Sequence, residues 1–150
     1  MNVQQKTKKD GFTIIEVVLV LAIAALIFLM VFIALPALQR SQRDTQRKND
    51  LARVQTALTN YQSNNRNQLP DNYATFANNY LKVGDDSFAD PDGTDYTFVV
   101  GTLPADFTAG RIYYTEGSIC DGESLDGGKG SSKVAFQYEL EGGGVACVNN

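Results

Sequence analysis

An unbroken apolar segment lies near the beginning of the sequence. Every residue from Val17 to Leu38 is apolar, which makes 22 consecutive positions. As a helix this segment would be about 33 Å long, enough to cross the roughly 30 Å hydrocarbon core of a bilayer. A cleavable secretory signal has a shorter apolar core, of about 7–15 residues. The pattern therefore predicts a membrane helix that stays in the finished protein.

The apolar segment continues into a polar and then an amphipathic stretch. Residues 39–50 contain no apolar side chain but are rich in Arg, Gln and Lys, which favour helix. Apolar side chains then recur at helical spacing, at Leu51, Val54, Leu58 and Tyr61. We expect one helix from Phe12 to about Ser63, roughly 78 Å long. It should kink or loosen just before Pro36, because proline removes a backbone hydrogen bond.

The remaining residues, 64–150, predict a small globular head. Asp71 or Asn72 can cap a short helix, one face of which carries Tyr73, Phe76, Tyr80 and Leu81. A tight turn at 90–93 should lead into a first strand at 96–100. Further strands are expected at 111–115, 133–140 and 145–148, with the clearest alternation at Val134, Phe136, Tyr138 and Leu140. About four antiparallel strands packed on the amphipathic half of a long helix give an α+β fold.

Charge is distributed unevenly along the chain. The net charge of −4 is the sum of +2 for residues 1–11, −1 for 12–38, +4 for 39–66 and −9 for 67–150. An acidic head disfavours nucleic acid, because phosphate binding needs clustered Lys and Arg. The basic run consists of Arg40, Arg43, Arg47 and Lys48. A solvated helix face or a contact with lipid headgroups explains this run better than nucleic-acid binding does.

Cysteine and histidine usage limits the possible chemistry. The chain has two cysteines, Cys120 and Cys147, and no histidine. It therefore lacks the commonest general base and the ligands of a zinc site, and we expect no enzyme activity, no metal and no cofactor. A disulfide between the two cysteines would close a loop of about 28 residues and stabilise it by roughly 3.6 kcal/mol. Such a bond places the head in an oxidising compartment; two unpaired cysteines are the alternative.

Five aspartates between Asp85 and Asp95 raise the question of calcium binding. Asp90 and Asp92 lack the third oxygen ligand, the glycine and the distal glutamate of an EF-hand loop. A solvated turn is the preferred interpretation, and a calcium site is the alternative.

Glu16 is the one charge next to the apolar segment on its N-terminal side. A carboxylate at the centre of a bilayer costs about 2.5–3.5 kcal/mol, less near its edge, and such a residue usually has a partner. If the chain were cut after Gly11, the new amine of Phe12 could approach Glu16 of a neighbouring chain shifted along the helix axis. The alternative is that Glu16 flanks the apolar segment at the level of the headgroups.

The stretch from Lys8 to Glu16, KKDGFTIIE, followed by the apolar segment resembles the class III signal of type IV pilins and pseudopilins. The resemblance implies that a membrane-embedded aspartyl peptidase, the prepilin peptidase, cuts after Gly11 and methylates the amine of Phe12. It implies that Glu16, at the fifth mature position, pairs with a neighbour's amine during assembly. Many pilins have a proline where this chain has Ile33, so the loosened helix segment of the family would shift to Pro36.

The resemblance also implies a domain organisation and a location. Residues 1–11 would be the leader, 12–38 the transmembrane and assembly half of the helix, 39–63 its amphipathic half, and 64–150 the head. The precursor would be anchored in the membrane with its head outside the cytosol, and the assembled protein would be an extracellular pilus. The loop closed by Cys120 and Cys147 would face the filament surface and carry adhesion specificity.

We therefore expect a structural subunit of a type IV pilus that serves adhesion and motility. Its partners would be copies of itself, the prepilin peptidase, the membrane as a reservoir and, indirectly, a pilus assembly platform and its ATPase. A pseudopilin of a type II secretion or DNA-uptake system is the alternative, favoured by the turn at Asp90. A non-polymerising membrane-anchored binding or hydrolytic domain is an alternative of another class.

Overall fold

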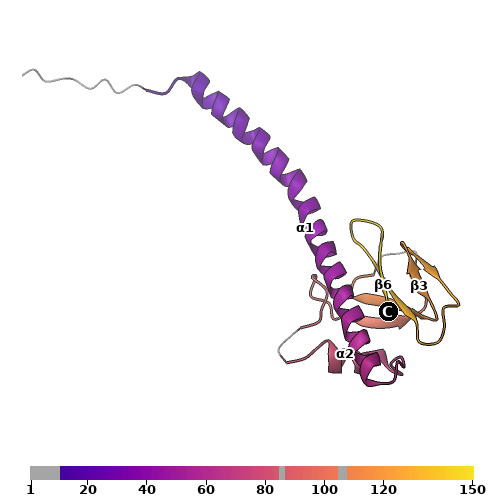
Figure 1. Ribbon diagram of the computed structural model, residues 1–150. Helices are drawn as coiled ribbons and strands as arrows, with labels where there is room; N and C mark the ends of the chain where they lie inside the picture. Colours follow the sequence, from indigo (N-terminus) through magenta and orange to yellow (C-terminus); the bar gives the residue numbers. More distant parts are fainter. Residues whose placement is uncertain (1–10, 85–86, 105–107) are drawn as a thin grey trace, which may run out of the picture. The chain divides into compact units, whose positions relative to one another are not determined.

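The computed structural model describes residues 11–84, 87–104 and 108–150. The chain divides into two units, Met1–Leu38 and Gln39–Asn150, and helix α1 (Ile14–Asn64) contributes to both. Figure 1 shows α1 in indigo to magenta. Its bounds agree within two residues with the helix predicted from the sequence. Pro36 lies inside α1, and the kink expected before it stays a prediction.

The head is built on a sheet of four strands, β1 (Thr97–Val100), β2 (Arg111–Glu116), β5 (Val134–Glu139) and β6 (Val145–Asn149), in the order β1-β2-β5-β6. The pairs β2–β5 and β5–β6 are antiparallel, as predicted. The prediction of an all-antiparallel sheet is wrong at one edge, where β1 runs parallel to β2. The four residues of β1 span only about 13 Å, so the connection at 101–110 is long enough to bring the chain back to the start of β2.

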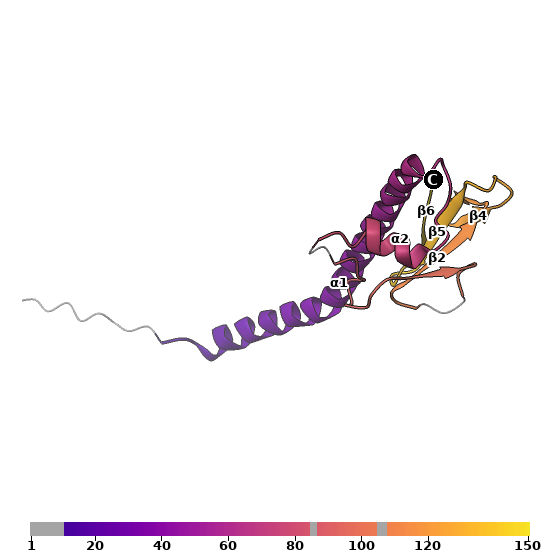
Figure 2. The same cartoon turned by 90° about the horizontal axis from the view of Figure 1, so that it is seen from below.

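A second, two-stranded sheet was not predicted. Strands β3 (Ile119–Asp121) and β4 (Ser124–Asp126) pair as an antiparallel hairpin. The disulfide Cys120–Cys147 links this hairpin to β6, and Gln137 Nε2 donates to the Glu123 carbonyl oxygen at 2.9 Å. Figures 1 and 2 show the hairpin on the side of the four-stranded sheet away from α1. The sheet is therefore covered on both faces, which explains why β5 is buried along nearly its whole length.

The inner face of the sheet packs against the amphipathic half of α1. The predicted stripe is confirmed, since Leu51, Val54 and Leu58 are at most 1% exposed and Tyr61 packs against the core they belong to. From the sheet, the alternating residues Val134, Phe136 and Tyr138 complete this core. The 3.6-residue period of the helix and the two-residue period of β5 thus present matching apolar surfaces.

The short helix α2 (Tyr73–Tyr80) covers the remaining part of the inner face. Its predicted cap is confirmed: Asn72 Oδ1 accepts hydrogen bonds from the backbone N–H groups of Ala74 at 2.9 Å and Thr75 at 3.0 Å. The ring of Tyr73 packs on aromatic rings from three strands, namely Phe98, Tyr114 and Phe136. Capping and aromatic packing together fix α2 on the sheet.

The basic run of α1 is only partly solvated: Arg40 and Lys48 are exposed, as the sequence interpretation expects, but Arg43 is half-buried and Arg47 is buried. Arg47 is only 1% exposed. Its Nε and Nη2 atoms donate to the two carboxylate oxygens of Asp90 at 2.9 and 2.8 Å. Its Nη1 atom donates to Asp44 at 2.9 Å and to Glu141 at 3.2 Å. Arg43 adds a second pair with Glu141 at 2.6 Å. We call Arg47, Asp44, Asp90 and Glu141 the buried ionic cluster.

The turn at 90–93 is present, but its first aspartate is not solvated as expected. The Gly93 N–H donates to the Asp90 carbonyl oxygen at 2.8 Å, and the φ of Gly93 is 93°, which favours glycine. The Asp90 side chain is 0% exposed and accepts a hydrogen bond from the Tyr138 hydroxyl as well as those from Arg47. Burial raises the pKa of Asp90, but the hydrogen bonds from Arg47 and Tyr138 outweigh burial and leave the pKa below its usual value.

Asp44, one turn before Arg47 in α1, binds the turn between β5 and β6. Its carboxylate accepts the backbone N–H groups of Glu141 at 2.9 Å and Gly142 at 2.7 Å. A side chain at position 142 would place its Cβ only 2.9 Å from Asp44 Oδ2, so this close approach explains the glycine. The cluster therefore connects three separate segments of the head, which local sequence patterns cannot indicate.

The buried ionic cluster predicts a large effect for Arg47→Ala. Removing the guanidinium leaves the buried Asp90 carboxylate without its counter-charge, which should lower the free energy of unfolding by about 3–5 kcal/mol. The control is Lys48→Ala at the neighbouring exposed position, which should change the free energy of unfolding by less than about 0.5 kcal/mol. Urea unfolding followed by tyrosine circular dichroism measures both. Equal stabilities of the two variants would contradict this role of the cluster.

The cluster also predicts that the head loses stability in acid. Hydrogen bonds from Arg43, and next from Arg47, lower the pKa of Glu141 to about 2, from 4.5 in the absence of such contacts. A carboxyl group whose pKa is lower in the folded than in the unfolded state stabilises the folded head. This contribution is complete above the unfolded-state pKa and is lost as the pH falls through the folded-state pKa. The free energy of unfolding should therefore decrease between about pH 4.5 and pH 2. Urea titrations across this range should show a smaller decrease for Glu141→Gln, and an unchanged decrease would refute the assignment.

Candidate processing and assembly site

The first residues of the described chain form a capped helix start. Helix α1 begins at Ile14, directly after Thr13. The Thr13 backbone N–H and hydroxyl both donate to Glu16 Oε2, at 2.8 and 2.7 Å. In return, the Glu16 N–H donates to Thr13 Oγ1 at 3.4 Å. This reciprocal pair is a capping box, which satisfies N–H groups that a helix start leaves without partners.

The capping box gives Glu16 a structural role that sequence reasoning missed. The signal was available, because Thr13-Ile14-Ile15-Glu16 has the Thr-x-x-Glu spacing of this motif. Glu16 was instead interpreted from the cost of its charge, a possible cationic partner or a position at the level of the headgroups. Both Thr13 and Glu16 lie after Gly11, so a cut at that glycine would leave the capping box intact.

The capping box uses only one of the two carboxylate oxygens of Glu16. Within the part of the chain that the structure describes, Oε2 accepts two hydrogen bonds, and Glu16 forms no ion pair. The carboxylate borders a surface hollow of about 480 Å³ that is otherwise lined by Phe12, Val17, Val20 and Leu21. Oε1 is therefore left for a donor from outside this helix, on an otherwise apolar surface.

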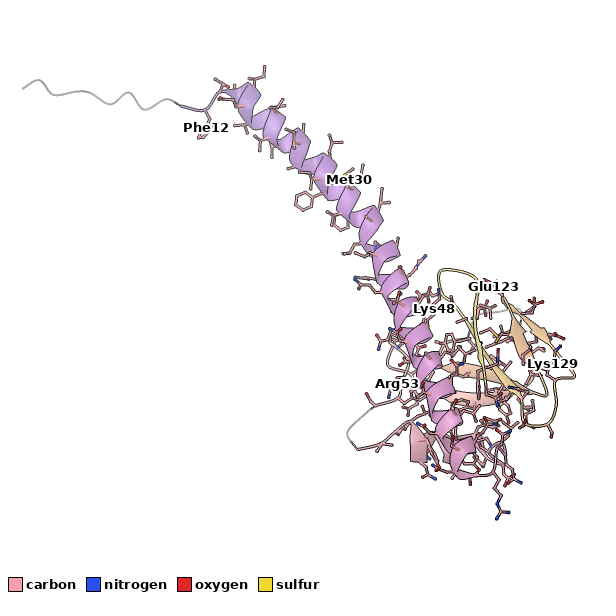
Figure 3. The ribbon with its side chains drawn as sticks, in the orientation of Figure 1. Phe12, Met30, Lys48, Arg53, Glu123 and Lys129 are labelled. Atoms are coloured by element: carbon pink, nitrogen blue, oxygen red, sulfur yellow. A yellow bond between two sulfur atoms is a disulfide. The ribbon has the colours of Figure 1, made fainter. Side chains whose placement is uncertain are left out.

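The apolar half of α1 is exposed throughout. Phe12, just before the helix, is 89% exposed, and Ile14 and Met30 within it are 86% and 75% exposed; Figure 3 labels Phe12 and Met30. One helix of the described chain, α1, is long and apolar enough to cross a membrane, and none of its most apolar stretch is buried. A surface of this size and character needs to be covered by lipid or by other chains.

Gly11 has no structural reason to be glycine. Among the described residues, no atom lies within 4 Å of where its Cβ would be, and its φ is not in the left-handed region. Packing and backbone conformation would both accept a larger residue here. The glycine is thus more simply explained by recognition from outside the chain.

The comparison with known families bears on this same segment. Residues 6–32 match the family described as the prokaryotic N-terminal methylation motif. The chain carries the class III signal of type IV pilins and pseudopilins. No curated protein and no solved structure matches the chain.

The pilin-type signal agrees with the remaining features of the chain. One long N-terminal helix on a small mixed sheet of four strands is a pilin-like layout. Together with the apolar helix, the signal indicates a precursor anchored in the membrane. It implies processing by prepilin peptidase and assembly into a pilus-type filament. Proteins of the pilin type that carry this signal are structural subunits.

The structure brings together some of the residues that the sequence singled out. Gly11 and Phe12 lie just before α1 and Glu16 in its first turn, and Phe12 and Glu16 both line the hollow described above. Cys120 and Cys147 form a disulfide with a Cα–Cα distance of 5.9 Å, far along the chain in the head. Among the described residues, no group of three or more His, Cys, Asp or Glu side chains is arranged to hold a metal ion.

The capping box predicts a local effect for Thr13→Ala. Loss of the hydroxyl should destabilise the first turn of α1 by about 1 kcal/mol and speed amide hydrogen exchange at residues 14–17 about fivefold. Thr13→Ser keeps the hydroxyl and should exchange as the unsubstituted chain does. Hydrogen exchange of the full chain in detergent micelles, read by mass spectrometry of N-terminal fragments, measures this. Identical exchange in the alanine and serine variants would refute the capping role.

Proposed function

We propose that this chain is the polymerising subunit of a type IV pilus. In this proposal the prepilin peptidase cuts after Gly11 and methylates the amine of Phe12, and the mature chain then leaves the membrane for a filament. The observation that carries the proposal is the single carboxylate, Glu16, on an exposed apolar helix that bears the methylation signal. An isolated anchor needs no charge at this depth, whereas a polymer of identical helices can use one.

The capping box supports a specific arrangement of the assembled chains. Glu16 Oε2 is held by Thr13 of the same chain, which fixes the carboxylate beside the apolar hollow. The other oxygen, Oε1, can then accept the Phe12 amine of a neighbouring copy. The hydrophobic effect is non-directional, so a directional ion pair would contribute most to the register between copies. In apolar surroundings a charge-assisted hydrogen bond is stronger than in water.

In this proposal the head keeps its folded structure while the chain moves from the membrane into the filament. The buried ionic cluster and the disulfide both tie segments of the head that are distant in sequence. In the filament the disulfide-linked hairpin β3–β4 would lie on the outer surface, with Cys120 and Cys147 protecting it from unfolding outside the cell. Adhesion and motility are the roles that such a surface filament would serve.

The variant Glu16→Gln tests the register model. Glutamine can still accept hydrogen bonds from Thr13, because a capping box tolerates glutamine, but it carries no charge. We expect the variant to be cut after Gly11 and methylated, as intact mass spectrometry would show, and to stay in the membrane with at least tenfold fewer filaments by electron microscopy. Normal filament numbers from Glu16→Gln would refute the register model, and a mature protein still beginning at Met1 would refute the pilin proposal itself.

A pseudopilin of a type II secretion or DNA-uptake system is the second candidate. One observation favours it: Asp90-Pro91-Asp92-Gly93, followed by Tyr96, forms the turn into β1, as the corresponding stretch does in pseudopilins that it resembles. Electron microscopy of cells that express the chain at its native level separates the two candidates. A pilus subunit gives long surface filaments whose loss follows deletion of this chain, and a pseudopilin gives none.

A further inference from the structure

The head contains a small pocket that neither processing nor assembly uses. It has a volume of about 210 Å³ and lies between the end of α1 and helix α2. Its lining combines Pro70 and three aromatic residues, Tyr61, Phe76 and Tyr80, with the polar residues Asp71, Thr75, Asn79 and Asn72, the last being the cap of α2. Pockets for drug-sized ligands measure roughly 300–1,000 Å³, so this one suits a single small ring.

The aromatic side of the pocket is held rigidly. Phe76 and Tyr80 are stacked with ring centroids 5.6 Å apart. Tyr61 meets both of them edge-on, at 5.8 Å from Phe76 and 5.4 Å from Tyr80. Phe76 is buried, whereas Tyr61 and Tyr80 are half-buried and reach the surface. The three rings therefore form a fixed apolar wall that is partly open to solvent.

The polar side of the pocket is free to bind a ligand. Asp71, Thr75 and Asn79 are exposed, and none of their side chains has a hydrogen-bond partner in the described part of the chain. Within the described residues, carboxylate, hydroxyl and amide groups therefore line this pocket without an intramolecular hydrogen bond.

A ligand for this pocket needs an apolar face and a polar edge. A purely apolar molecule would remove water from Asp71 and Asn79 without replacing its hydrogen bonds. An anion would meet the Asp71 carboxylate, and the lining contains no lysine or arginine to compensate. A pyranose ring fits both requirements, because its C–H groups can stack on a tyrosine ring while its hydroxyls bond to a carboxylate and an amide.

We propose that this pocket binds a neutral pyranose sugar. The sugar stacks on Tyr61 and Tyr80, its hydroxyls donate to the Asp71 carboxylate, and the Asn79 amide exchanges hydrogen bonds with a neighbouring hydroxyl. All of these residues belong to one head, so the binding does not depend on polymerisation. In a filament each subunit would present one such site, and weak individual binding would gain strength from the number of copies. The site is separate from the disulfide-closed loop in which adhesion was expected from the sequence.

The test is sugar binding by the purified full chain in a detergent that has no sugar headgroup. Saturation-transfer NMR ranks the methyl glycosides of glucose, galactose, mannose and N-acetylglucosamine, with N-acetylneuraminic acid as the anionic control. Isothermal titration then measures the dissociation constant of the best neutral sugar. We expect Asp71→Ala and Asn79→Ala each to raise this dissociation constant about tenfold. Asn78→Ala is the matched control: it is exposed on the same helix, outside the pocket lining, and should bind normally.

Several outcomes would overturn the proposal. The proposal is wrong if none of the four neutral sugars binds, or if N-acetylneuraminic acid binds as tightly as the best neutral sugar. The same conclusion follows if Asp71→Ala and Asn79→Ala bind like the Asn78→Ala control. All three variants remove side chains without intramolecular hydrogen bonds, so their melting temperatures should match and unfolding should not confuse the result. Filament formation is scored separately, so a failure of sugar binding leaves the pilus proposal intact.

Discussion

The rest of this structure depends on one constraint, the need to cover a long apolar helix that carries a carboxylate at its start. From Phe12 onward the first half of α1 is exposed in the isolated chain, and water is not a tolerable environment for a surface of this size. Lipid can cover the apolar side chains, but its hydrocarbon core offers no counter-charge to Glu16. In the proposed filament a neighbouring copy with a free amine would offer both, so the same helix could be held in a membrane and then stabilised in a filament.

The two halves of α1 solve different problems with different chemistry. The first half is apolar from Val17 to Leu38, so its contacts with lipid or with other helices are non-directional. The second half is fixed to the head, by the apolar stripe that begins at Leu51 and, before it, by the buried ionic cluster around Arg47. An ion pair is a directional contact, and the bidentate Arg47–Asp90 pair sets position more narrowly than apolar packing alone. The head can thus keep its structure while the apolar half changes its surroundings.

Much of this could be predicted from the sequence, wherever local periodicity carries the information. The extent of α1, the Asn72 cap of α2 and the alternation along β5 follow from patterns a few residues long. The parallel pairing of β1 with β2 does not, because strand order depends on the whole connection at 101–110. The hairpin β3–β4 was missed because its strands are only three residues long, too short for a periodic pattern to show. Arg47 and Asp90 are separated by 43 positions, a distance that local patterns do not span. Arg47 was therefore interpreted as part of a solvated helix face. At the assembly site, the Gly11–Glu16 signal was readable, and the Thr13–Glu16 capping box was readable but overlooked.

The central claim is that a carboxylate of one copy meets the amine of another. A density map of the assembled filament, at a resolution that resolves side chains, tests it most directly. The account predicts the Phe12 nitrogen of one copy within about 4 Å of Glu16 Oε1 of a neighbour, with Oε2 still bound to its own Thr13. A map in which Glu16 contacts only its own chain, or in which the neighbour's amine lies elsewhere, would contradict it.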